Sequence, residues 1–420
     1  MNKTPKKSLS TAEIVQSGLK KRYRAERRFR LFGVLAIVIS LMFLVILFAD
    51  ILWKGAPAFR QTHIKIDVFF DPALIPLNNS DRADYRGLVK KNLRNLFPEV
   101  SGRRPKRELN KLISSGAAYE LREMVVADPG LVGTTSELWL PADDAVDIFF
   151  KGYTEGDRFS ERQRKWLKTL QDEGRLRKQF NVALFTNGDS RDPELAGILG
   201  ALSGTIFTLL ITVLISFPIG VATAIYLEEF AAKNRLTDFL EVNINNLAAV
   251  PSIIFGLLGL AVFINFFGLP RSAPVVGGLV LTLMTLPTII IAGRAALKAV
   301  PPSIREAALG IGASKMQTIM HHVLPLAMPG MLTGTIIGMA RALGETAPLL
   351  MIGMVAFIVD IPKTFTSPAT ALPVQIYLWA DSPERAFAER TSAAIIVLLV
   401  FLIVMNATAV VLRKKFERRW

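Results

Sequence analysis

The stretch that decides the fold runs from Ser303 to Asp360 and reads SIREAALGIGASKMQTIMHHVLPLAMPGMLTGTIIGMARALGETAPLLMIGMVAFIVD. Its first third is polar and broken by glycines, and the remainder is almost continuously apolar. Ser303 with Glu306 has the Ser-x-x-Glu spacing of a capping box. Ser314 with Gln317 repeats that spacing, so we expect two short helices that start at these serines. The stretch therefore predicts a helix-turn-helix on a membrane surface, followed by a membrane span.

Part of this stretch resembles a known element. Glu306, Ala307 and Ala308, followed by Gly312 and by Leu324-Pro325, resemble the EAA loop of ABC-importer permeases, which docks into a cleft of the ATPase subunit. The resemblance assigns ATPase coupling to these six residues, within a loop that we place at 303–325. One position departs from the pattern, because His322 stands where the family usually has an aliphatic residue.

Two further motifs narrow the resemblance. Residues 344–350, GETAPLL, resemble the phosphate-specific permeases, and residues 372–383, LPVQIYLWADSP, resemble their PstA-type subunit. The matches reach from about Gly197 to the C-terminus. The resemblance implies that phosphate is the transported substrate. It also implies three kinds of partner: a second, PstC-like permease, a pair of ATPase subunits, and a periplasmic phosphate-binding protein.

Composition agrees with a membrane protein that also has a soluble part. Of 420 residues, 51% are hydrophobic, and the net charge of +15 is concentrated partly in two terminal arms. No cysteine is present, which excludes disulfides, thiol nucleophiles and thiolate metal sites. The adjacent His321 and His322 would point about 100° apart on a helix, so we expect no metal site.

Six apolar segments are long enough to cross a membrane. They are Leu31–Ala49, Leu195–Leu227, Val242–Pro270, Ser272–Gly293, Val323–Val359 and Thr391–Leu412. The arm at 1–30 has ten Lys/Arg against two Glu, and the tail at 413–420 has five against one. Basic arms favour the cytoplasmic side, and an even number of spans places both termini there. A cleaved signal peptide ending near Ala56-Pro57-Ala58 is the alternative for the first segment.

The predicted fold is an all-α, six-span inner-membrane permease with an inserted extracytoplasmic α+β domain. We divide the chain into the arm at 1–30, the first span at 31–52, the insert at 53–194, the permease core at 195–412 and the tail at 413–420. The insert would be periplasmic, and the resemblance does not extend to it. A spacer or docking platform is preferred there over a ligand-binding role.

Within the insert, three local patterns predict structure. Residues 64–70 alternate like a short strand, and residues 106–125 are expected to form one helix. Ser160 with Gln163 forms another capping box, and Gly174 is expected to stop the helix that begins there.

Two charges interrupt the fifth apolar segment. Arg341 and Glu345 are spaced i, i+4 and therefore share one helical face. They could form a structural ion pair or line a substrate path, and we favour the path because charges inside a membrane usually serve function. A guanidinium suits phosphate because its planar fork donates two hydrogen bonds.

A break in the same segment is also expected. A straight helix over residues 323–359 would be about 55 Å long, too long for one crossing. We expect the break near Thr346, with that residue as the cap and Pro348 early in a new half-helix whose N-terminus faces the anion.

The sequence contains no Gly-x-x-x-x-Gly-Lys-Ser/Thr motif, and residues 310–315 have the wrong spacing for one. We therefore expect a transport subunit without cofactor or enzymatic activity, driven by a separate ATPase. The short loop from Glu228 to Glu241 is a second candidate contact for that ATPase. The alternatives are a permease for sulfate or molybdate and, from another class, a membrane-bound phosphate sensor; no output domain follows the last span.

Overall fold

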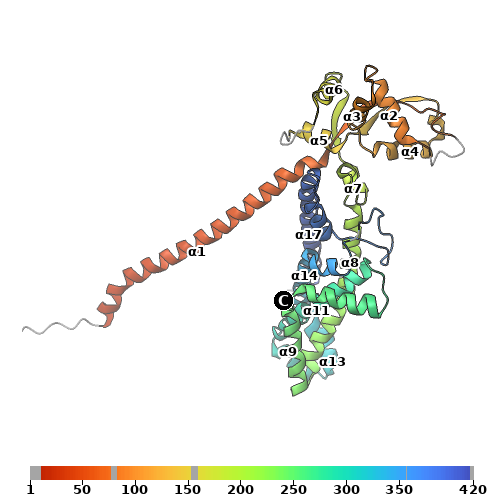
Figure 1. Cartoon of the computed structure of the whole chain (residues 1–420). Helices are drawn as coiled ribbons and strands as arrows, with labels where there is room; N and C mark the ends of the chain where they lie inside the picture. The colour runs from red at the N-terminus through yellow and green to blue at the C-terminus, as the bar shows by residue number, and fades with distance from the viewer. Residues whose placement is uncertain (1–10, 77–82, 153–158, 356, 417–420) are drawn as a thin grey trace, which may run out of the picture. The chain divides into compact units, whose positions relative to one another are not determined.

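The computed structural model describes residues 11–76, 83–152, 159–355 and 357–416. These residues belong to two units, divided between Trp53 and Lys54, which we describe separately. Nearly all of the first unit belongs to helix α1 (Thr11–Gly55), shown in red in Figure 1. Its side chains from Arg22 to Asp50 are exposed, and its apolar part is long enough to span a membrane.

The insert in the second unit is built on a three-stranded antiparallel sheet in the order β2-β1-β3. The central strand β1 (Arg60–Phe69) pairs His63 with Pro141 of β2 (Thr135–Pro141) and Arg60 with Phe180 of β3 (Leu176–Phe180). Ile64, Ile66 and Val68 alternate along β1 and are fully or almost fully buried. The short strand predicted at 64–70 is therefore confirmed, and it begins earlier.

Helices cover the buried side of this sheet and fill the insert's core. They are α2 (Tyr85–Asn95), α3 (Arg103–Asn110), α4 (Ala117–Ala127), α5 (Asp144–Lys151) and α6 (Glu161–Asp172), with the shorter η1 (Ala56–Phe59), η3 (Pro129–Leu131), α7 (Ala183–Thr186) and η4 (Pro193–Leu195). The Ser160 capping box is present, and Gly174 follows α6 with φ +67°. Both of these predictions are confirmed.

The single helix predicted over 106–125 is wrong. Helix α3 ends at Asn110 and α4 begins at Ala117, because the backbone between them bonds to the end of β2. The amide of Ser114 donates to the carbonyl of Pro141, and the amide of Asp143 donates to the carbonyl of Leu112. These bonds require extended backbone and interrupt the helix.

The core of the second unit is helical. Its elements are α8 (Leu199–Ile225), η5 (Tyr226–Phe230), α9 (Arg235–Ala249), α10 (Ser252–Leu258), η6 (Gly259–Phe266), α11 (Pro274–Lys298), α12 (Pro302–Gly310), α13 (Lys315–Thr318), η7 (Ile319–Val323), α14 (Leu324–Gly344), α15 (Ala347–Met351), α16 (Leu372–Ala380) and α17 (Ala386–Phe416). Of these, η5, η6 and η7 are π-helical. In the described chain, five helices can span a membrane, or six if α9 and the continuous helix of α10 and η6, which form a bent pair, count as one span.

The third expected span, Val242–Pro270, is not one straight helix. Helix α9 ends before Pro251, and the helix that starts at Ser252 runs at 104° to it. Proline lacks an amide donor and disfavours helical backbone at the residue before it, here Val250. The segment is therefore a broken span or a re-entrant loop.

Small residues bring the core helices close together. A Cβ at Gly278 of α11 would lie 2.6 Å from the side chain of Ile211 on α8, and one at Gly334 of α14 would lie 2.2 Å from the Cβ of Ala292 on α11. Such close backbone approach is the usual mode of helix packing in membranes. Helices α8, α11 and α14 therefore form the packed centre of the core.

The insert lies at the end of the core where α8 and α17 begin (Figure 1). Polar contacts join the two parts. Lys151 Nζ lies 2.6 Å from Glu389 Oε1, and Trp379 Nε1 donates to Asp189 Oδ1 at 2.9 Å. Directly after the insert, the carbonyl of Ala196 accepts from Arg390 Nη1 at 2.6 Å. The insert is thus held by α16 and α17 and is not only tethered by its chain ends.

Candidate functional site

The polar turn consists of α12 and α13, joined through Gly312, which has φ +90°. The Ser314 box is confirmed: Ser314 Oγ accepts from the amide of Gln317 at 3.3 Å, and Gln317 Oε1 accepts from the amide of Ser314 at 2.9 Å. The box predicted at Ser303 is wrong. Helix α12 begins one residue earlier, because Pro302 suits the first helical position, and no side chain caps it.

The predicted coupling residues differ in exposure. Glu306, Ala307 and Gly312 are exposed, Leu324 and Pro325 are half-buried, and Ala308 is buried at 4% exposure. Apolar side chains are exposed on the same turn, among them Leu309, Ile311 and Met316, and Met320 is exposed directly after it. The turn therefore presents a mixed apolar and acidic surface.

Ion pairs hold this turn against the ends of the core helices. Arg305 Nη2 lies 2.7 Å from Glu229 Oε1, and Nη1 donates to the carbonyl of Val300 at 2.7 Å. Lys315 lies 5.0 Å from the ring centroid of Phe230. Arg305 was not singled out from the sequence, although the segment from Glu228 to Glu241 had been noted as a second contact.

A second set of ion pairs lies beside the first. Arg294 of α11 contacts Glu241 of α9 at 2.7 Å and Glu228 of η5 at 3.3 Å. Together with the Arg305–Glu229 pair, these contacts connect α12 to η5, and they connect η5 through Arg294 to α9 and α11.

Arg341 and Glu345 form an ion pair, with 3.5 Å between Nε and Oε1. The Arg341 side chain is 46% exposed and that of Glu345 is 19% exposed. Ile337 and Gly344 are exposed on the same face of α14, and a Cβ at Gly344 would meet nothing within 4 Å. Met339 and Leu343, on the opposite face of α14, are buried. Arg341 thus lies on an uncovered helical face.

The helix break predicted near Thr346 is present, directly after this ion pair. Helix α14 ends at Gly344 and α15 begins at Ala347, with Pro348 in its first turn. Thr346 stands at the cap position, but its side chain makes no capping bond, so that detail of the prediction is wrong. Its backbone is in the helical region, with φ −102° and ψ −45°, unlike the extended backbone of a typical capping residue.

A glycine that sequence reasoning missed positions this break. A Cβ at Gly256 of α10 would lie 2.7 Å from Pro348 Cα and 2.9 Å from its carbonyl oxygen. The helix that begins after the Pro251 bend therefore packs directly against α15. In the sequence this contact is indicated only by the glycine in SIIFGLL, residues 252–258. A glycine in an apolar helix equally fits helix packing in general.

Buried acids lie where the insert meets the core. Burial raises the pKa of Asp143 to about 8, with the charge of Asp144 as the next cause. Burial also raises the pKa of Glu194, although Ser114 Oγ donates to its carboxylate at 2.6 Å. In the described part of the chain, no group of three or more His, Cys, Asp or Glu residues is arranged to hold a metal ion.

Comparison with known proteins gives two family matches. Residues 216–420 match the family described as "Binding-protein-dependent transport system inner membrane component". Residues 16–158 match a domain of unknown function, DUF3333. The second match covers α1 and most of the insert, the part of the chain to which the motif resemblance did not extend.

Individual relatives agree with the first match. The chain is 33% identical over 223 residues to "Phosphate transport system permease protein PstA 1" of Mycobacterium tuberculosis, covering 53% of this chain and 72% of that protein. It is 30% identical over 227 residues to "Phosphate transport system permease protein PstA" of Haemophilus influenzae, covering 54% and 79%.

Among solved structures, the chain is similar to one in "Inward facing conformations of the MetNI methionine ABC transporter". The identity is 19% and the TM-score 0.41, covering 53% of this chain and 95% of that one. The motifs around Glu306 and Gly344, the apolar helices that carry them, and the identity to named relatives over more than two thirds of their length agree. The chain therefore belongs to the PstA-type permeases of the binding-protein-dependent transport family.

Proposed function

We propose that this permease subunit of an ABC importer carries inorganic phosphate across the inner membrane. The observation that supports this most is Arg341, a guanidinium on an uncovered face of α14, three residues before the helix breaks. Charge-assisted hydrogen bonds from a planar guanidinium match the geometry of phosphate oxygens. Glu345, Thr346 and Pro348 complete the proposed substrate path.

Uptake competition tests this function. In vesicles containing the assembled importer, we expect unlabelled phosphate, but not sulfate or molybdate, to compete with labelled phosphate. Equal competition by sulfate would favour the alternative, a permease for another oxyanion. Binding of phosphate without any uptake would favour a sensor.

We propose that the turn of α12 and α13 docks on the ATPase. Glu306, Ala307 and Gly312 are exposed there, next to apolar side chains of which Ile311 is 82% exposed. Exposed apolar patches with polar surroundings commonly mark protein interfaces. Ala308 is buried beneath the turn and supports it from inside, as Leu324 and Pro325 do at its end. The remaining partners are a second, PstC-like permease and a periplasmic phosphate-binding protein.

The docking role predicts that Gly312→Asp abolishes ATPase copurification while membrane insertion stays normal. A residue with a side chain at φ +90° is strained, and the turn would change shape. The matched control is Gly174→Asp, because Gly174 also has a positive φ, and at both positions an added Cβ would meet nothing within 4 Å. Copurification at the wild-type level in Gly312→Asp would remove the docking role of this turn.

We propose that both termini and the docking turn lie in the cytoplasm and residues 53–194 in the periplasm, because both terminal arms are basic. Because the chain has no cysteine, single cysteines report on it directly. Ser101 and Ile311 are both exposed, so Ser101→Cys and Ile311→Cys should react with a membrane-impermeant reagent. We expect labelling from opposite sides of the membrane. Labelling from the same side would contradict the proposed orientation.

A further inference from the structure

A dense group of arginines lies directly before the apolar part of α1. Residues 20–30 contain seven Lys/Arg against one Glu, and Leu31 starts an apolar run on the same helix. The helix continues without interruption from Thr11 to Gly55. A basic segment is therefore followed by an apolar segment on one continuous helix.

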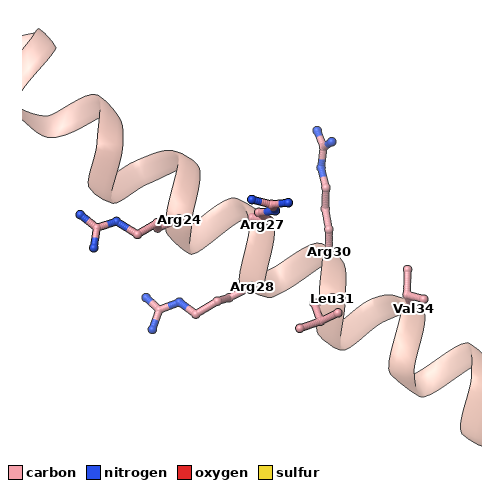
Figure 2. A pocket seen from close by; sticks show the side chains of 6 residues that line it. All are labelled: Arg24, Arg27, Arg28, Arg30, Leu31 and Val34. Atoms are coloured by element: carbon pink, nitrogen blue, oxygen red, sulfur yellow. The ribbon is translucent and has the colours of Figure 1, made fainter.

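Four of these arginines and two apolar residues line one pocket on α1, of about 850 Å³ (Figure 2). Arg24, Arg28 and Leu31 are spaced i, i+4 and i+7, and Figure 2 shows them on one side of the helix. Arg27, Leu31 and Val34 are spaced i, i+4 and i+7, so Val34 lies only about 60° around the helix from Leu31. Arginines and apolar residues of the span therefore share one broad face of α1.

The charges on this surface are only partly balanced. Arg30 pairs with Glu26 at 2.5 Å, with the arginine side chain 77% exposed. Within the described part of the chain, no carboxylate pairs with Arg27 or Arg28. The surface therefore has guanidinium donors available for an external anion.

The spacing fits a ligand with an anionic head and an apolar tail. Arg24 and Leu31 are separated by about 10 Å along the helix axis, and Arg28 and Leu31 by about 4.5 Å. Guanidinium groups bind phosphate oxygens through paired hydrogen bonds. A free phosphate ion has no part that could contact Leu31 or Val34, whereas a phospholipid has an acyl chain that can.

We propose that residues 24–34 of α1 bind an anionic phospholipid of the membrane in which the chain is embedded. The lipid phosphate lies against Arg24, Arg27 and Arg28, and an acyl chain follows Leu31 and Val34. Basic residues at the end of a membrane span attract anionic lipids. This inference does not depend on the transported substrate.

Native mass spectrometry of the full-length chain in detergent tests the proposal. The probes are dioleoyl phosphatidylglycerol and dioleoyl phosphatidylcholine, which share acyl chains and differ in net charge. The test variant is the triple Arg24→Gln, Arg27→Gln, Arg28→Gln. The matched control replaces three exposed arginines of α3, Arg103, Arg104 and Arg107, by glutamine.

We expect the wild type and the α3 control to retain phosphatidylglycerol in preference to phosphatidylcholine. In the α1 variant this preference should fall by at least about tenfold, since each basic residue near an anionic membrane changes binding by about fivefold. The variant keeps Lys20, Lys21, Arg22 and Arg30, so the basic bias of the arm persists. If it nevertheless expresses poorly, the triple replacement by lysine retains the charge, and it should lower the preference less than glutamine does.

Three results would overturn the proposal. The first is equal retention of the two lipids by the wild type. The second is an unchanged preference in both α1 variants, which would reduce the arginines to a general positive bias. The third is displacement of phosphatidylglycerol by inorganic phosphate at the same concentration, which would assign the surface to a free anion.

Discussion

Replacement of Arg341 by glutamine is expected to lower phosphate uptake per assembled complex about ten- to hundredfold. Hydrogen bonds to charged groups contribute about 1.5–3 kcal/mol, and that is the range lost when a guanidinium that meets the substrate is removed. Assembly should be nearly unchanged. The Arg341 side chain is 46% exposed in this chain, so the replacement removes little packing within it.

The double variant Arg341→Gln, Glu345→Gln separates the two interpretations of the pair. If the pair is only structural, removing both charges also removes the cost of leaving one unpaired, and uptake returns. If Arg341 contacts phosphate, the double variant assembles but does not transport. Arg341→Lys retains the charge and loses the planar fork, so it should transport poorly under the substrate interpretation.

Arg104 and Glu108 of the insert provide a matched control for this series. They are also an i, i+4 pair, at 3.4 Å, with the arginine exposed. The same replacements at Arg104 and Glu108 should leave uptake unchanged. Wild-type uptake in the Arg341 double variant would show that the substrate does not need Arg341.

Much of the membrane architecture could be predicted from the sequence. Length and hydropathy determine where helices can cross, and basic arms mark their ends, so the expected spans coincide with the long apolar helices apart from the third. The break after Gly344 was predictable because a continuous helix would exceed the membrane thickness. Both predictions use only the length, hydropathy and charge of individual segments, and they need no contact between distant residues.

Other features depend on contacts between distant segments and could not be predicted. The bend at Pro251 matters because it brings Gly256 against Pro348, a neighbour nearly a hundred residues away in the chain. Arg305 has no motif of its own, and its role depends on Glu229. The helix expected over 106–125 failed because the end of β2 bonds to its middle.

The same limit explains why the attachment of the insert was missed. Asp147 and Lys151 have the i, i+4 spacing of a helical ion pair, but Glu389 lies in a different part of the chain and no spacing connects it to them. In the fold, Lys151 Nζ lies 2.6 Å from a carboxylate oxygen of each acid. The three side chains are 11%, 6% and 9% exposed in that order. A buried ion triad therefore joins α5 of the insert to α17.

Breaking this triad is the second change from which we expect a large effect. Lys151→Met leaves Glu389 and Asp147 without their lysine in a buried site, and removing one partner of a buried pair costs about 3–5 kcal/mol. The amide of Thr62 on β1 donates to Asp147 at 2.8 Å. Local unfolding around the triad should therefore extend into the sheet. Amide exchange of β1 and α5 should accelerate by about a hundredfold or more.

The control and the rescue variant make this test specific. Lys65 and Glu137 form an ion pair across β1 and β2 with both side chains partly exposed, so Lys65→Met should cost less than about 1 kcal/mol. The double variant Lys151→Met, Glu389→Met replaces two buried charges by apolar groups and leaves Asp147 as the one remaining acid of the triad, so it should recover part of the protection lost in Lys151→Met. Hydrogen exchange followed by mass spectrometry on the full chain measures all three variants. Equal acceleration in Lys65→Met and Lys151→Met, or none in either, would show that the triad does not hold the insert to the last span.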